Sequence, residues 1–150
     1  MKLTSSAFQN GGKIPSEYTC DGPNICPPLA ISEVPAEAKS LVIIMDDPDV
    51  PKSIRPDGMW DHWVVFNIPP HVREIKKGKE PVGTHGKGTG GNQDYYGPCP
   101  PDREHRYFFK LYALDATLDL PAQSSKKQVE KTMEGHIIAQ TELMGKYERQ

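Results

Sequence analysis

The sequence predicts a mainly β protein, a Greek-key β-sandwich closed by a C-terminal amphipathic helix. Fifteen prolines and 13 glycines stand among its 150 residues, and every proline lies between Pro15 and Pro121. A proline inside a helix costs about 3 kcal/mol, so a mainly helical fold is excluded before residue 121. Three apolar runs supply candidate core strands, and the proline-free tail is available for a helix. The length is that of one domain, which we place at residues 1–150.

The three runs differ in the burial that they predict. Leu41–Met45 is apolar at every position and predicts a strand covered on both faces. His62–Ile68 predicts a second core strand, which ends before two prolines. Arg106–Leu114 alternates polar and apolar residues over its first half, so one face should be more buried than the other. Weaker strands are expected at 3–8 and 29–34. Long connections between the strands favour Greek-key crossings over a meander.

The tail carries the pattern of an amphipathic helix of about 20 residues. Ser125 and Gln128 have the spacing of a capping box. At 100° per residue, eight residues fall within an arc of about 120°. They are Val129, Met133, His136, Ile137, Gln140, Leu143, Met144 and Tyr147. His136 lies on this arc, which predicts a buried, hydrogen-bonded histidine.

Composition excludes several classes of protein. Eighteen basic and 20 acidic residues give a net charge of −2, which disfavours nucleic acid as a partner. No apolar run approaches the length of a transmembrane helix, and the first residues lack the apolar core of a signal peptide. The three cysteines, Cys20, Cys26 and Cys99, are odd in number and predict reduced thiols. We therefore expect a cytoplasmic protein.

A glycine-rich segment at 86–91 contains the spacing G-x-G-x-x-G. A dinucleotide site requires a strand before this motif and a helix after it. The following residues, Asn92 to Pro98, cannot open a helix. The motif therefore predicts a loop at a functional rim rather than a nucleotide site.

Two proline-braced turns stand beside the core strands. Asp47-Pro48-Asp49-Val50-Pro51 follows the most buried strand, and Gly97-Pro98-Cys99-Pro100-Pro101 precedes the third. Prolines stiffen both turns, so each can hold a ligand at little ordering cost. His62 and His105 open the adjacent strands at the same level. Imidazole donors near the Asp47 carboxylate predict a small polar pocket suited to an anion.

Two other chemistries use the same residues. Asp47, His62, Cys99 and His105 could supply zinc ligands, but none has the local spacing of a metal motif, and we expect no metal or other cofactor. Cys99 could also act as a nucleophile with either histidine, as in a weak hydrolase. Cys99 lies between prolines with no helix N-terminus to lower its thiol pKa, so we expect a protein that is not an enzyme.

Four motifs together resemble the phosphatidylethanolamine-binding protein family, in particular its bacterial and archaeal Raf-kinase-inhibitor-like branch. They are Asp47-Pro48-Asp49-x-Pro51, Trp60-x-His62-Trp63, Gly97-Pro98-Cys99-Pro100-Pro101 and His105-Arg106-Tyr107. Each motif is weak alone, but their order and spacing are specific, and the likeness spans nearly the whole chain.

The resemblance implies a β-sandwich with flanking helical segments and a shallow cavity for phosphate, acetate or a phosphorylated head group. It also implies a cis peptide at Asp47-Pro48 and a homodimer. The ligand-binding residues that it implies are Asp47, Trp60, His62, Gly97, Cys99, Pro100, Pro101, His105 and Tyr107.

The sequence thus favours a small-anion-binding protein with a regulatory or inhibitor role. Hydrogen bonds from His62, His105 and loop N–H groups would hold the anion, and binding should weaken as the pH rises through about 6.5. The alternatives are an inhibitor that engages a kinase or protease through the pocket rim and loop 83–97, and the weak hydrolase.

Overall fold

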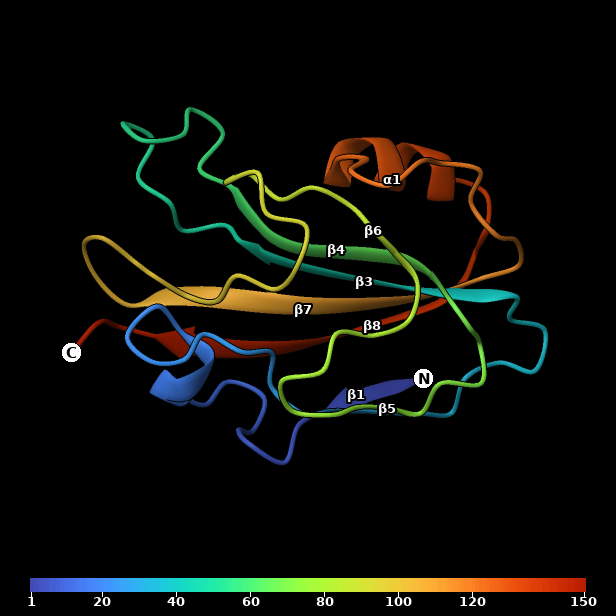
Figure 1. Cartoon of the computed structure of the whole chain (residues 1–150), viewed down its shortest axis with the longest axis horizontal. Coiled ribbons are helices and arrows are strands. Elements are labelled where there is room, and N and C mark those ends of the chain that lie inside the picture. Colours follow the sequence, from blue (N-terminus) through green and yellow to red (C-terminus); the bar gives the residue numbers. More distant parts are fainter.

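Two antiparallel β-sheets make up the fold of the computed structural model, which describes all residues 1–150 (Figure 1). The smaller sheet has the order β1-β2-β5, from Lys2–Thr4, Leu29–Ser32 and Glu74–Ile75. The larger has the order β6-β4-β3-β7-β8, from Thr84–His85, Trp60–Ile68, Ser40–Asp47, His105–Leu114 and Ile137–Tyr147. The mainly β prediction is confirmed.

The central strand β3 is buried along its whole length, as the sequence predicted. Leu41, Ile43 and Met45 join the larger core cluster, which also contains residues of the smaller sheet. Val42 and Ile44 point the other way and join a second cluster with side chains of the helix. The two faces of β3 therefore fill two cores, one between the sheets and one beneath α1, Lys126–Met133.

Strand β7 crosses over in the sheet, since it follows β6 in the chain but pairs with β3. Its predicted alternation is confirmed: Tyr107, Phe109 and Leu111 are fully buried, whereas Arg106 is exposed. Figure 1 shows β3, β4 and β7 running side by side, with α1 on one side of this sheet and β1 and β5 on the other.

The predicted 20-residue C-terminal helix is wrong beyond its first two turns. The capping box is present, since Ser125 accepts from the Gln128 N–H and Gln128 accepts from the Ser125 N–H. The helix ends at Met133, and Gly135 takes a left-handed conformation with φ of 82°. Residues 137–147 then form β8, paired with β7 over nearly its full length.

A strand fits this segment because its buried positions alternate near the end, at Leu143, Gly145 and Tyr147. Leu143 and Tyr147 also lie on one arc of a helical wheel with Gln140 and Met144, whereas Gly145 does not, so the apolar pattern alone did not separate the two structures. Pairing with β7 decides in favour of the strand. His136 is exposed rather than buried, and its Nδ1 lies 2.8 Å from Asp115 Oδ1.

Two further expectations are corrected. Cys20 and Cys99 form a disulfide across a sequence separation of 79, so the prediction of three reduced thiols is wrong; only Cys26 is free, and it is buried. The peptide bond between Asp47 and Pro48 is trans, because the chain has no cis peptide bond. No helix has the length and apolar character to cross a membrane.

Candidate functional site

The ends of three neighbouring strands bring the predicted pocket residues together. In an antiparallel sheet, the last residue of β3 lies beside the first residues of β4 and β7. Asp47 thus pairs directly with Trp60 of β4. His62 stands two residues along β4, and His105 opens β7. The shared edge explains how residues far apart in the sequence reach one place.

A cavity of about 260 Å³ opens at this edge. This volume is slightly below the usual range for sites of drug-sized ligands, about 300–1,000 Å³, and it suits a small compound. Most of the lining is apolar or aromatic. The lining residues are Asp47, Val50, Ile54, Trp60, His62, Tyr96, Cys99, Pro101, His105 and Tyr107.

His105 is fully buried between two carboxylates. Its Nδ1 lies 2.6 Å from Asp47 Oδ2, and its Nε2 lies 2.7 Å from Asp102 Oδ1. A carboxylate can only accept, so both nitrogens donate when the ring is an imidazolium. Burial raises the pKa of Asp47, opposed by the hydrogen bond from His105. Burial also acts to raise the pKa of Asp102, but the His105 hydrogen bond and charge outweigh it and leave that pKa lowered.

His62 is a neutral group in this site. Its Nδ1 donates to the Tyr96 carbonyl at 2.7 Å, because a carbonyl oxygen cannot donate. Burial lowers the pKa of His62 to about 4, against an ordinary value of 6.5. The ring lines the cavity, and Nε2 makes no hydrogen bond within the chain. Nε2 therefore offers a lone pair, and the imidazole donor expected from the sequence is absent near neutral pH.

The Tyr107 hydroxyl is buried and has no hydrogen-bond partner. The ring stands edge-on to His62, with centroids 5.4 Å apart, and lines the same cavity. Burial raises the pKa of this phenol, and the negative charge of Asp47 raises it further. The hydroxyl therefore keeps its proton. A donor without a geometric partner inside the chain, at the wall of a cavity, is available to a ligand or to water.

An ion pair fastens the turn after β3 to the start of β7. The Arg106 guanidinium donates to Asp49 at 3.0 and 2.8 Å, and the Arg106 backbone N–H donates at 2.8 Å. The same hydrogen bond holds the pKa of Asp49 below its ordinary value, against burial. Asp49 and Arg106 are neighbours of the lining residues Val50, His105 and Tyr107, so these contacts link two segments that carry part of the lining.

Two of the nine predicted ligand residues, Gly97 and Pro100, lie outside the cavity lining. Both are buried in the turn behind it. Gly97 donates its N–H to Asn24 Oδ1 at 2.7 Å, and a Cβ there would collide with the Tyr18 carbonyl oxygen. Glycine serves here for close approach of two backbone segments.

Replacing Gly97 by alanine should therefore lower the free energy of unfolding by about 1–3 kcal/mol, because the turn must shift away from Tyr18. Urea denaturation of the two proteins measures this difference. The control is Ala122→Gly, which exchanges the same two residue types in an exposed turn. Gly11→Ala would not serve as a control, because Gly11 has a positive φ that strains alanine. Equal unfolding free energies for wild type and Gly97→Ala would contradict this role.

Three lining residues, Val50, Ile54 and Tyr96, were missed by the sequence analysis. Val50 and Ile54 belong to the connection between β3 and β4, and Tyr96 precedes the proline turn. Tyr96 stacks on His62 with ring centroids 6.4 Å apart. The adjacent turns gave a signal for Val50 and Tyr96, but the path of the connection that carries Ile54 depends on tertiary contacts.

The two alternative chemistries at this site, a Cys99 nucleophile and a zinc site, need groups that are bonded to other residues in the structure. Cys99 is bonded to Cys20, so a hydrolase with a Cys99 nucleophile would first need that disulfide reduced. The ring nitrogens of His105 both face carboxylates, and one nitrogen of His62 is tied to a carbonyl. Of the residues considered for zinc, only His62 therefore keeps a ring nitrogen free of hydrogen bonds within the chain.

A family model described as phosphatidylethanolamine-binding protein matches residues 4–148. That match covers nearly the whole chain and decides the family. The chain belongs to the phosphatidylethanolamine-binding protein family. The bacterial and archaeal branch that the sequence motifs indicated is confirmed by its relatives.

Those relatives of the phosphatidylethanolamine-binding protein family span this chain end to end. A UPF0098 protein of Chlamydia trachomatis is 50% identical over 149 residues, with 99% of both chains covered. A UPF0098 protein of Methanothermobacter thermautotrophicus is 48% identical over 155 residues, again with 99% of both covered.

Solved structures of the family agree with the fold. A homologue from Chlamydia trachomatis has a TM-score of 0.96 at 50% identity, covering 99% of this chain and 97% of that one. YbcL of Escherichia coli, described as a member of the mammalian family, has a TM-score of 0.89 at 29% identity, covering 99% and 98%.

Proposed function

We propose that this family member is a binding protein, not an enzyme, for a small phosphate- or carboxylate-bearing compound in the cavity at Tyr107. The single observation that carries the proposal is the buried, unpartnered Tyr107 hydroxyl beside the free Nε2 of His62. The pair offers one donor and one acceptor in a space of about 260 Å³. The name of the matching family describes a ligand with a phosphorylated head group, which agrees with this chemistry.

A phosphate monoanion complements the pair. Its P–OH group can donate to His62 Nε2, and a phosphoryl oxygen can accept from Tyr107. The apolar walls, with Val50, Trp60 and Pro101, would cover the remainder of a small ester. A hydrogen bond to a charged group contributes about 1.5–3 kcal/mol, so affinity between millimolar and micromolar is expected after association costs.

This arrangement changes the source of the expected pH dependence. His62 does not titrate near 6.5, since its pKa is about 4. The proton that matters between pH 5.5 and 8 belongs to the phosphate, whose esters have a second pKa of about 6. Loss of the P–OH donor places a phosphate oxygen against the His62 lone pair, so affinity should still fall as the pH rises.

Calorimetric titration with inorganic phosphate and with phosphoethanolamine tests the proposal. We expect Tyr107→Phe to bind both about tenfold or more weakly than wild type at pH 6, since the loss of one charge-assisted hydrogen bond costs at least about 1.4 kcal/mol. The variant should be about as stable as wild type, because the hydroxyl that it removes has no hydrogen-bond partner within the chain.

Tyr112→Phe is the matched control, because Tyr112 lies on β7 outside this cavity. Its affinity for phosphate should equal that of wild type. Tighter binding of phosphoethanolamine than of phosphate would favour a head group over the free ion. Equal phosphate affinity in wild type and Tyr107→Phe would remove the central contact of the proposal.

A second role, binding of a protein at the pocket rim, draws support from two exposed apolar side chains that line the cavity. Ile54 and Tyr96 are 50% and 41% exposed. A kinase or protease as the target, and a homodimer, remain proposals. Pull-down with wild type and a His62→Ala/His105→Ala double variant would separate partner binding from ligand binding.

A further inference from the structure

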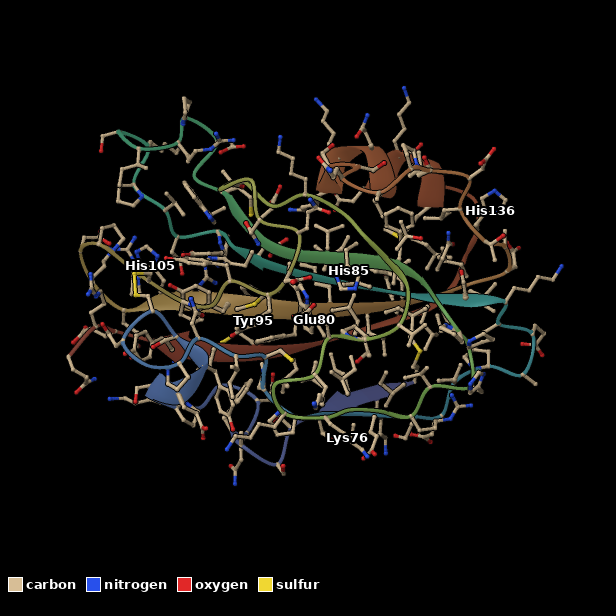
Figure 2. All side chains as sticks on the ribbon, viewed as in Figure 1. Lys76, Glu80, His85, Tyr95, His105 and His136 are labelled. Carbon is tan, nitrogen blue, oxygen red and sulfur yellow. A yellow bond between two sulfur atoms is a disulfide. The ribbon has the colours of Figure 1, made fainter.

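A second group of ionisable side chains lies apart from the ligand cavity, where the two ends of the glycine-rich segment meet. Glu80 and His85 come before this segment and Asp94 follows it. Their nearest ligand atoms all lie within 4.8 Å of one another. Figure 2 shows the labelled Glu80 and His85 close together beside the large sheet. From the sequence alone His85 had no assigned role, because it lacks the context of His62 and His105 beside the proline turns.

Both ring nitrogens of His85 face oxygen atoms. Nε2 lies 3.1 Å from the Pro81 carbonyl oxygen, which can only accept, so Nε2 donates whenever Nδ1 binds a cation. Nδ1 then faces three oxygen atoms: the Gln93 carbonyl at 3.1 Å, Asp94 Oδ1 at 3.4 Å and Glu80 Oε1 at 3.5 Å. A lone pair and three oxygens repel one another, so a positive charge must lie between them, either a second ring proton or a cation.

The carboxylates have no other source of positive charge. Neither Glu80 nor Asp94 has a lysine or arginine partner within 4.0 Å; each forms an ion pair only with His85. Two N–H groups also hold Glu80 in position: Trp63 Nε1 donates to Oε1 at 2.9 Å, and the Tyr95 backbone N–H donates to Oε2 at 3.1 Å. Outer hydrogen bonds that orient a carboxylate, and a histidine whose second nitrogen donates to a carbonyl, are typical of metal ligands.

The spacing is also that of a metal site. Nδ1 has one hydrogen-bond contact, with the Gln93 carbonyl, and the two carboxylate oxygens lie slightly farther away, at 3.4 and 3.5 Å. Zinc bonds to nitrogen and oxygen are about 2.0–2.2 Å long, so neighbouring ligands of a tetrahedral site are about 3.4 Å apart. The three distances from Nδ1 agree with this edge length. Asp94 is largely exposed, with 74% of its side chain accessible, and can close the remaining distance to Glu80.

We propose that Glu80, His85 and Asp94, with the Gln93 carbonyl, form a binding site for a divalent transition-metal ion of the zinc class. Imidazole nitrogen suits zinc and its neighbours, whereas magnesium and calcium prefer oxygen ligands alone. The bound ion would join β6 to the end of the glycine-rich segment and fix the residues that lead to Tyr96. The site is separate from the Tyr107 cavity, and its proposal does not depend on the ligand proposed there.

Titration of the chelator-treated, disulfide-intact protein with zinc chloride tests this site. We expect one zinc ion per chain and a rise in Tm, with no rise for magnesium at the same concentration. Asp94→Asn should weaken zinc binding at least tenfold, and His85→Gln should abolish the one-to-one binding. Cobalt(II) should give the absorption bands of a nitrogen and oxygen ligand set without a thiolate charge-transfer band, which excludes Cys26 as the ligand.

His136→Gln is the matched control, since His136 also faces a carboxylate, Asp115, at 2.8 Å but has no third ligand. Zinc affinity should be unchanged in that variant and in Tyr107→Phe. Either of two results would overturn the proposal: no saturable zinc binding by wild type, which would leave a protonated His85 as the only positive charge, or equal zinc affinity in wild type and His85→Gln.

Discussion

Replacement of both Cys20 and Cys99 by serine is expected to lower the free energy of unfolding by about 2–4 kcal/mol. The disulfide closes a loop with a sequence separation of 79, for which the chain-entropy relation gives about 4.5 kcal/mol as an upper estimate. The fold should survive this loss, because other contacts join the same segments. Tyr95 donates its hydroxyl to the Tyr18 carbonyl at 2.7 Å, and the Cys20 N–H donates to the Pro98 carbonyl at 3.1 Å.

Urea denaturation with and without a reductant measures this contribution. Wild type should approach the stability of the double variant when the disulfide is reduced, while the double variant should not respond. Cys26→Ser, which removes the free buried thiol, should respond to the reductant as wild type does. Identical unfolding curves for oxidised wild type and the double variant would show that the disulfide contributes nothing to stability.

The second large effect is the acid sensitivity that His62 should confer. An unfolded histidine titrates near 6.5, whereas burial lowers the pKa of His62 in the folded protein to about 4. Between these values the unfolded chain binds the extra proton and the folded chain does not. His62 therefore favours the folded state fully above pH 6.5, and this contribution is lost as the pH falls toward 4. A shift of this size corresponds to about 3 kcal/mol.

Comparison of wild type with His62→Gln isolates this effect, because the carboxyl groups titrate in both proteins. Between pH 7 and pH 4, wild type should lose about 3 kcal/mol more unfolding free energy than the variant. NMR titration of the His62 ring should give a pKa near 4. Parallel pH profiles of the two proteins, or a His62 pKa near 6.5, would contradict the neutral ring on which the ligand chemistry depends.

The core strands could be predicted from the sequence because their apolar runs are local. Leu41–Met45 has no polar residue to place toward solvent, so burial on both faces followed directly. The position of the pocket could also be predicted from the sequence, since Asp47, His62 and His105 lie at strand ends that an antiparallel sheet brings together. These inferences use only the period of a strand and the residues that end it.

The errors share a different cause, namely dependence on contacts between distant segments. Residues 137–147 fit a helix by periodicity, and only their pairing with β7 makes them a strand. The bond between Cys20 and Cys99 joins residues with no local signal between them. The donor role assigned to His62 failed because burial and the Tyr96 carbonyl, neither visible in the sequence, set its protonation.

The central claim is that a small oxyanion occupies the cavity between Tyr107 and His62. A crystal structure of wild type grown or soaked with phosphate at pH 6 tests it most directly. We predict tetrahedral density in the cavity, with one oxygen within hydrogen-bond distance of Tyr107 Oη and another within that distance of His62 Nε2. A cavity that holds only water while phosphate binds elsewhere, or a metal ion coordinated by His62, would contradict the account.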